Sequence, residues 1–177
     1  LSATIYAEII AAAGFPDGAF NLIHGDGPSV GAALSRHPDI QMMSFTGSTR
    51  AGTAVTKDAA DTLKRVTLEL GGKSPNIVFA DCDLKEHVVT SVQECFFNTG
   101  QSCDAPTRML VERRCYEEVL EIVNRTAREQ RVGDPSQEGD HIGPLFDRIQ
   151  FDRVQTLIEA GIAEGARLIA GGPGRPE

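Results

Sequence analysis

The stretch that decides the fold runs from residue 40 to residue 70 and reads IQMMSFTGSTRAGTAVTKDAADTLKRVTLEL. Residues 40–45, which are mostly apolar, are typical of a strand, and the segment ends at a threonine, a glycine and a serine. Residues 51–60 favour a helix, and residues 64–70 alternate apolar and polar side chains as a strand does. A strand, a helix and a second strand in this order indicate a parallel sheet with helices on its faces.

The flanking sequence continues this α/β alternation. Before residue 40, apolar spacing predicts a helix over residues 5–13, a short strand over 19–23 and a helix over 30–34. After residue 70, the predicted strands cover residues 75–79, 109–111 and 168–170, and the predicted helices cover residues 88–96, 119–127 and 154–162. The pattern changes near Gly71 and Gly72, and we therefore expect one domain part over residues 1–71 and a second over residues 72–177.

The composition narrows the function classes. The protein has 177 residues, 25 of them acidic and 17 basic, for a formal charge of −8, and no basic face typical of a nucleic-acid binder is visible. No apolar run approaches the ~18–20 residues that cross a bilayer, so a membrane partner is not expected. The four cysteines form no CxxC pair and the four histidines no HxxxH pair, which predicts neither a disulfide framework nor a metal site. These patterns favour a reducing, cytoplasmic location, with an organelle matrix as the alternative.

The first candidate for chemistry is the turn FTGSTRAG at residues 45–52. Gly47 follows a predicted strand, and Ser48 is placed to cap the next helix, whose unpaired N–H groups suit a phosphate. A plain capped turn explains the same residues equally well. The glycines at 25, 27 and 31 miss the GxGxxG dinucleotide spacing by one residue, so they are a weak signal.

The second candidate is Glu69, which lies between two leucines near the end of a predicted strand that two glycines follow. Alternation places Glu69 and Thr67 on the face opposite Val66, Leu68 and Leu70. A carboxylate partly desolvated between leucines has a raised pKa and is a better base near neutral pH. A solvated, outward-facing glutamate is the competing interpretation.

The third candidate is Cys103, in a loop between a predicted helix and Pro106. The loop is expected to hold the sulfur at an exposed bend and to aim the Cys103 N–H at an oxyanion. At an unperturbed pKa of ~8.5 only about 3% of a thiol is thiolate at pH 7, so a nucleophilic role needs activation. A buried, inert thiol is the alternative here, and we expect it for Cys82, Cys95 and Cys115.

Taken together, these stretches resemble the NAD(P)-dependent aldehyde dehydrogenase family. The resemblance rests on FTGS at 45–48, LELGGKSP at 68–75 and GQSC at 100–103, with FPDG at 15–18 and GPL at 143–145 in support. Position 103 lies 34 residues after position 69, which is the family's usual separation of cysteine and glutamate. The likeness extends over essentially the whole chain and implies parts of two Rossmann-like domains of the aldehyde dehydrogenase fold.

The resemblance also implies roles for individual residues. Cys103 would be the nucleophile and Glu69 the general base, and the two would share one cavity. The residues that it places beside NAD or NADP are Gly47, Ser48, Gly52, Leu70, Gly27 and Pro28. Ser102 and Asp104, on either side of the nucleophile, would line the substrate pocket. Residues 1–71 would be the second half of the cofactor-binding domain, and residues 72–177 the first part of the catalytic domain.

The implied reaction converts a small-molecule aldehyde to a carboxylic acid through a thiohemiacetal and a thioester on Cys103. The family's second oxyanion donor, an asparagine, and its ribose-binding glutamate are expected outside these residues, as are the strands that build its homodimers and homotetramers. We therefore expect an internal segment that alone neither turns over aldehydes nor binds NAD tightly.

Three other functions stay open at this point. A CoA-acylating aldehyde dehydrogenase would pass the thioester to CoA, but such members generally lack the glutamate base, so Glu69 favours hydrolysis. A non-catalytic binding or structural protein would retain the fold without using Cys103. A cysteine-dependent hydrolase would need no cofactor.

Overall fold

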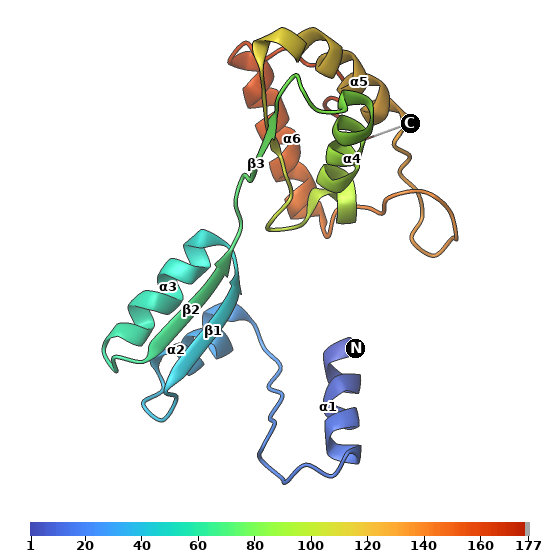
Figure 1. The fold of residues 1–177 in the computed structure, drawn as a ribbon. Helices are drawn as coiled ribbons and strands as arrows, with labels where there is room; N and C mark the ends of the chain where they lie inside the picture. The colour runs from blue at the N-terminus through green and yellow to red at the C-terminus, as the bar shows by residue number, and fades with distance from the viewer. Residues whose placement is uncertain (176–177) are drawn as a thin grey trace. The chain divides into compact units, whose positions relative to one another are not determined.

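The structure, a computed structural model, describes residues 1–175. It divides into two compact units, Leu1–Leu70 and a second that begins at Gly71, each with one two-stranded parallel sheet (Figure 1). In the first unit, the elements are α1 (Ser2–Ala12), a π-helical turn (Gly27–Gly31), α2 (Ala32–Arg36), β1 (Met42–Gly47), α3 (Thr49–Ala60) and β2 (Arg65–Leu70). In the second, they are β3 (Pro75–Val78), α4 (Leu84–Phe96), a 3₁₀ turn (Phe97–Gly100), β4 (Arg108–Val111), a 3₁₀ turn (Arg113–Cys115), α5 (Tyr116–Glu129) and α6 (Arg148–Ala163).

In the first unit, β1 and β2 run parallel, with Met42 opposite Arg65 and Gly47 opposite Leu70. Helix α3 connects the two strands and packs against both, and α2 packs against α3 (Figure 1). The strand–helix–strand prediction is confirmed. The alternation along β2 is confirmed as well, because its apolar side chains are half-buried while Thr67 and Glu69 are exposed.

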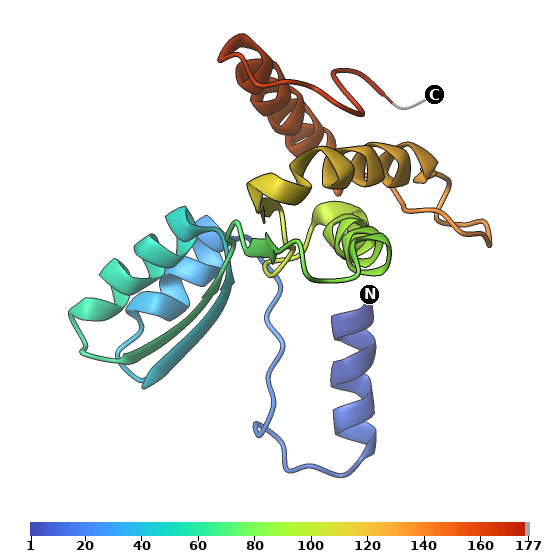
Figure 2. The same ribbon diagram turned by 45° about the horizontal axis from the view of Figure 1, so that its top comes forward.

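In the second unit, β3 and β4 run parallel, and α4 and α5 lie side by side (Figure 2). The core consists of small and branched side chains from β3, α4, α5 and the turn before it: Val78, Val88, Cys115, Val119 and Ile122. Apolar residues three or four apart on α4 and α5 reach this core, which is why the helical spacing was readable from the sequence.

Glu112 joins the ends of β3 and β4. Its N–H donates to the Val78 carbonyl at 2.9 Å, and its carboxylate accepts the Ala80 N–H at 2.9 Å. The Arg114 side chain, which also donates to this carboxylate, and the Ala80 N–H hold the pKa of Glu112 below its ordinary value. The backbone and the side chain of Glu112 together therefore close the sheet at the end where the chain leaves β3.

Two predicted strands are wrong. Residues 19–23 and 168–170 have no strand conformation. A strand is stable only when a neighbour accepts its backbone hydrogen bonds, and neither segment pairs with another strand among the described residues. Phe20 instead meets the ring of Tyr6 edge to face, with centroids 5.8 Å apart, and Leu168 remains 50% exposed.

Two features of the described residues bear on the class of function. None of the helices between residues 1 and 175 is both long and apolar enough to cross a membrane. Over the same residues, His, Cys, Asp and Glu side chains nowhere gather in a group of three or more that could hold a metal ion.

Candidate active site

The turn between β1 and α3 is a capped helix start. Ser48 has an extended backbone, and its hydroxyl accepts the Ala51 N–H at 3.2 Å, which confirms the predicted cap. Among the described residues, the N–H groups of Thr49 and Arg50 have no acceptor. Two unpaired N–H groups at the positive end of a 12-residue helix provide a place for an anionic group.

Two glycines in and beside this turn lie close to neighbouring side chains. A Cβ atom on Gly47 would lie 2.5 Å from the Phe45 ring, and one on Gly52 would lie 2.8 Å from a methyl group of Leu70. Gly52 is buried in the contact between α3 and β2. The absence of a side chain at Gly52 therefore lets α3 approach β2, whereas at Gly47 it leaves room for the Phe45 ring of the same strand.

The other glycine cluster forms a short π-helical turn that starts at Gly27 and Pro28. Asp26 caps it by accepting the Ser29 N–H at 2.8 Å, and the hydroxyl and N–H of Ser29 together lower the pKa of Asp26. A Cβ on Gly27 would meet no atom within 4 Å. The space beside Gly27 is therefore open.

Glu69 lies one residue before the end of β2, opposite Thr46 of β1. Its side chain is exposed and shares a face with Ser44, Thr46 and Thr67, because α3 covers the opposite face of this sheet. The partial desolvation expected between two leucines is therefore absent from this unit: Leu68 and Leu70 point the other way.

Cys103 lies in a tight turn. The Ala105 N–H donates to the Ser102 carbonyl at 3.3 Å, which makes Cys103 and Asp104 the two central residues. Ala105 is only 4% exposed and anchors the turn, whereas Cys103 and Asp104 are exposed. The predicted exposed bend is confirmed. Over the described part of the chain, neither the Cys103 N–H nor the Asp104 carboxylate has a hydrogen-bond partner.

The backbone just before this turn is strained. Asn98 and Thr99 have φ values of 50° and 60°, and Gly100 follows at 71°. A left-handed conformation costs of the order of 1–3 kcal/mol for a residue with a side chain, and more than usual for a β-branched one such as Thr99. The Thr99 hydroxyl donates to the Gly143 carbonyl at 2.9 Å, a contact between residues 44 positions apart. Sequence reasoning missed this contact because no local pattern signals it.

The three remaining cysteines lie in protected environments. Cys115 is buried in the core of the second unit, and Cys82 is half-buried against that core. Cys95 is half-buried on α4, and this burial raises the pKa of its thiol. Of the four, only Cys103 is exposed, as is expected of a reactive thiol.

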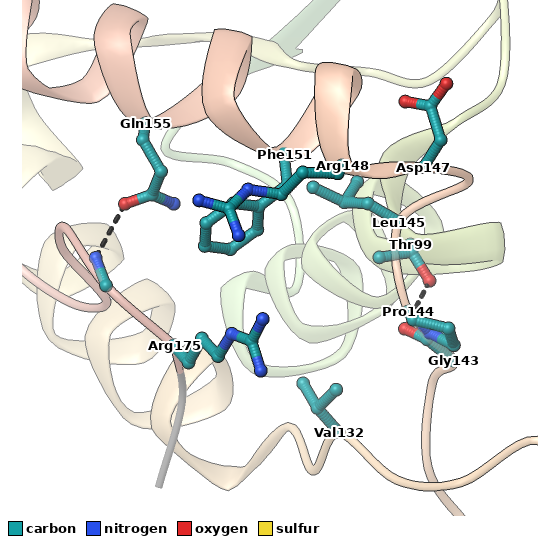
Figure 3. Close-up of a pocket in the computed structure, with 11 residues that line it drawn as sticks. Thr99, Val132, Gly143, Pro144, Leu145, Asp147, Arg148, Phe151, Gln155 and Arg175 are labelled. Carbon is teal, nitrogen blue, oxygen red and sulfur yellow. Dashed lines mark hydrogen bonds between the residues drawn. The ribbon is translucent and has the colours of Figure 1, made fainter.

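A pocket of about 600 Å³ lies in the second unit, between α6 and the chain around Gly143 (Figure 3). Phe151 forms part of its wall, and the guanidinium carbons of Arg148 and Arg175 each lie 5.8 Å from the centre of that ring. Thr99 lines the pocket, but Ser102, Cys103 and Asp104 do not. It is therefore a separate hollow that shares one residue with the Cys103 loop.

The expected site residues fall into two groups. The second unit contains Ser102, Cys103 and Asp104. The first unit contains the other expected residues: Gly27, Pro28, Gly47, Ser48, Gly52, Glu69 and Leu70. Within the first unit, Gly47 and Leu70 are paired at the end of the sheet, with Thr46 opposite Glu69 beside them. Within the second, Ser102 and Asp104 flank Cys103 in one turn.

A model of the aldehyde dehydrogenase family matches residues 1–177. The chain belongs to the aldehyde dehydrogenase family. It is 51% identical over 176 residues to the 3-succinoylsemialdehyde-pyridine dehydrogenase of a Pseudomonas species, covering 99% of this chain and 37% of that protein. The chain thus spans little more than a third of the length of the relatives it matches.

Solved aldehyde dehydrogenases have the same fold. The enzyme from Bartonella henselae matches with a TM-score of 0.96 and 52% identity, over 99% of this chain and 37% of that one. Aldehyde dehydrogenase C from Pseudomonas syringae, a variant with one cysteine changed to alanine and complexed with NAD+ and octanal, matches with a TM-score of 0.97 and 51% identity. That match covers 100% of this chain and 36% of the other. The expected α/β fold is therefore confirmed as the aldehyde dehydrogenase fold.

Proposed function

We propose that these residues are an internal segment of an NAD(P)-dependent aldehyde dehydrogenase that oxidises an aldehyde to a carboxylic acid. The observation that carries the proposal is the Cys103 turn, which presents an exposed thiol and an unpaired N–H in a chain that belongs to this family. The cysteine-to-alanine change in the Pseudomonas syringae complex with NAD+ and octanal supports it.

Cys103 is the proposed nucleophile. Its thiolate attacks the aldehyde carbon, the carbonyl π electrons move to oxygen, and a thiohemiacetal anion forms on the sulfur. The Cys103 N–H has no acceptor among the described residues, so it is free to donate to that oxyanion without first breaking another bond. Ser102 and Asp104 flank the sulfur and are the proposed contacts of the substrate.

The first unit supplies the proposed contacts of NAD or NADP. The free N–H groups of Thr49 and Arg50, after Gly47 and Ser48, fit a diphosphate, and the open space beside Gly27 and Pro28 fits a flat group. Gly52 and Leu70 contribute by keeping α3 close to β2. When bound, the cofactor supplies the hydride acceptor of the oxidation.

Glu69 is the proposed general base. It takes a proton from water, whose oxygen attacks the thioester carbon, and the Cys103 thiolate leaves as the acid forms. Exposure of Glu69 on the open face of β2 leaves its carboxylate free of any partner in the first unit. A thioester intermediate passed to CoA is the competing outcome, and the presence of a carboxylate at position 69 favours hydrolysis.

The domain assignment belongs to the same proposal. Residues 1–71 are the second half of a cofactor-binding domain, and residues 72–177 are the first part of the catalytic domain. The complete protein would act as a homodimer or homotetramer on a small-molecule aldehyde, in the cytoplasm or an organelle matrix.

The test uses the full-length protein that contains this segment, assayed for NAD(P)H with acetaldehyde, octanal and succinic semialdehyde. Cys103→Ala should lower kcat by about a thousandfold or more, because the covalent route is lost. Glu69→Gln should retain a first turnover of NAD(P)H, while steady-state turnover falls by about a hundredfold because the thioester accumulates.

Matched controls are Cys95→Ala and Glu121→Gln, which alter a half-buried thiol on α4 and an exposed carboxylate on α5. Both should leave kcat within about twofold of the unmodified enzyme. Full activity in Cys103→Ala would disprove the nucleophile, and a rate that rises with added CoA would replace hydrolysis by CoA acylation.

A further inference from the structure

The Asn98–Gln101 segment forms a reciprocal clasp over the strained backbone before Cys103. The Gln101 N–H and the Gln101 side-chain amide both donate to the Asn98 carbonyl, at 3.1 Å each. The Asn98 side chain donates in return to the Gln101 carbonyl at 3.2 Å. These three hydrogen bonds surround Thr99 and Gly100 and hold them in the left-handed conformation.

The same Gln101 side chain also reaches a distant part of the second unit. Its Oε1 accepts the Phe146 N–H at 2.9 Å, a contact between residues 45 positions apart. With the bond from Thr99 to Gly143, this contact ties the loop to the segment that leads into α6. A glutamine is suited to both tasks, because its amide offers a donor to one carbonyl and an acceptor to one N–H.

The position of Gln101 in the chain makes this clasp relevant to the sulfur. Gln101 is the second residue before Cys103, and buried Ala105 is the second residue after it. Between these two anchors, Ser102, Cys103 and Asp104 form the turn. The direction in which the chain leaves Gln101 therefore sets where the thiol and the N–H of Cys103 point.

We propose that Gln101 is a positioning residue that aims the Cys103 thiol and N–H at the aldehyde by holding the loop to Asn98 and Phe146. The inference rests on the proposed function. Misplacing a reacting atom by about 1 Å can lower a rate by roughly a hundredfold, so a lost clasp should act on the chemical step. Loss of the clasp should affect the binding of the aldehyde and of NAD(P)+ less, because Gln101 contacts neither of these substrates in this proposal.

The test compares Gln101→Met and Gln101→Glu in the full-length enzyme, with the best aldehyde of the panel above. Methionine keeps the length of the side chain and loses both hydrogen bonds. Glutamate keeps an acceptor for the Phe146 N–H but places an oxygen against the Asn98 carbonyl. Gln130→Met is the matched control, because the Gln130 side chain donates to the neighbouring Arg131 carbonyl and to no other group within residues 1–175.

The measurement is the rate and amplitude of the first turnover of NAD(P)H after rapid mixing, together with KM for both substrates. Gln101→Met should lower the first-turnover rate by roughly tenfold to a hundredfold, with the amplitude per enzyme subunit and both KM values within about twofold. The first-turnover rate of Gln101→Glu should lie between the rates of Gln101→Met and the unmodified enzyme. The rate of Gln130→Met should match that of the unmodified enzyme.

Other outcomes contradict the inference in distinguishable ways. An unchanged first-turnover rate in Gln101→Met overturns the positioning role and leaves the proposed function intact. A reduced amplitude with an unchanged rate shows a role in folding only, and it also overturns the inference. An unmodified enzyme that makes no NAD(P)H, or an active Cys103→Ala, overturns the proposed function and this inference with it.

Discussion

At the scale of single residues, the four cysteines differ in the environments of their thiols. Cys103 is exposed in a turn, Cys115 is buried in a core, and Cys82 and Cys95 are half-buried. The thiolate is the reactive form of a cysteine. Burial of Cys95 both limits the access of a reagent to its sulfur and raises the pKa of its thiol, which lowers the thiolate fraction. Accessibility alone therefore separates the proposed nucleophile from the structural thiols.

We predict that iodoacetamide modifies Cys103 about tenfold faster than Cys95 or Cys115 near neutral pH, because only the Cys103 sulfur is exposed. The measurement is the time course of alkylation for each cysteine-containing peptide by mass spectrometry. A Cys103→Ser variant should show no fast phase. Alkylation of Cys95 or Cys115 before Cys103 in the native protein would contradict the prediction.

At the scale of elements, the contact between α3 and β2 depends on a glycine. Gly52 allows the helix to approach the strand until the position of a Cβ lies 2.8 Å from Leu70 Cδ2. Glycine in a helix interior costs about 1 kcal/mol relative to alanine, so the position sacrifices helix propensity for close packing. Gly161 in α6 has no such neighbour, because its Cβ would meet nothing within 4 Å.

These two glycines should therefore respond differently to substitution. We expect Gly161→Ala to raise the free energy of unfolding by up to about 1 kcal/mol, from helix propensity alone. Gly52→Ala should raise the free energy of unfolding by less than Gly161→Ala does, because the Leu70 side chain must move. Gly52→Val should lower the free energy of unfolding by about 1–3 kcal/mol through overpacking. Urea unfolding of the three variants measures the order, and a Gly52→Val protein as stable as Gly161→Ala would contradict it.

The hydrogen bonds of the Glu112 carboxylate, at the ends of β3 and β4, make a pH-dependent contribution to stability. The hydrogen bond from Arg114 and then the one from the Ala80 N–H lower the pKa of this carboxyl. A group with a lowered folded-state pKa stabilises the fold above its unfolded pKa, which is about 4.3 for glutamate. That contribution is lost as the pH falls through the lower, folded-state pKa.

We therefore predict that Glu112→Gln lowers the urea midpoint at pH 7, and that its difference from the unmodified protein shrinks as the pH falls below about 4. Urea titrations at a series of pH values measure the difference. Glu121→Gln, which removes an exposed carboxylate on α5, serves as the control and should show no comparable trend. A difference in urea midpoint between Glu112→Gln and the unmodified protein that stays constant with pH would disprove this role of the Glu112 carboxylate.

At the scale of the whole molecule, each sheet within residues 1–175 has only two strands, and large apolar side chains are exposed there. On α1 alone, Ile5, Tyr6 and Ile9 are each more than half exposed. Two-stranded sheets are marginally stable by themselves, and parallel strands usually have both faces covered. The chain spans about 37% of the related Pseudomonas enzyme, so two-thirds of such a protein lies outside the matched region.

We accordingly predict that the 177-residue chain expressed alone neither turns over aldehydes nor binds NAD tightly. Calorimetric titration with NAD+ and an NAD(P)H assay on the isolated chain measure this, with the full-length protein as the positive control. NAD(P)H production by the isolated chain that disappears in Cys103→Ala would show that this segment suffices for catalysis.

The sequence by itself was sufficient for the local features. The helix that ends before Gly14, the Ser48 cap, the alternation along β2 and the exposed bend at Cys103 follow from the chemistry of neighbouring residues. The resemblance to the family rested on short motifs of the same local kind. The two strands over residues 19–23 and 168–170 were mispredicted because a strand needs a partner that no local pattern supplies.

The tertiary structure alone decided the contacts between residues far apart in the chain. Gly52 meets Leu70 because a helix folds back on its own sheet, and Glu112 joins two strands. Gln101 reaches Phe146 across 45 positions. Helical spacing, strand alternation and capping signals extend over only a few residues, whereas a hydrogen bond between distant residues depends on where the fold carries each of them.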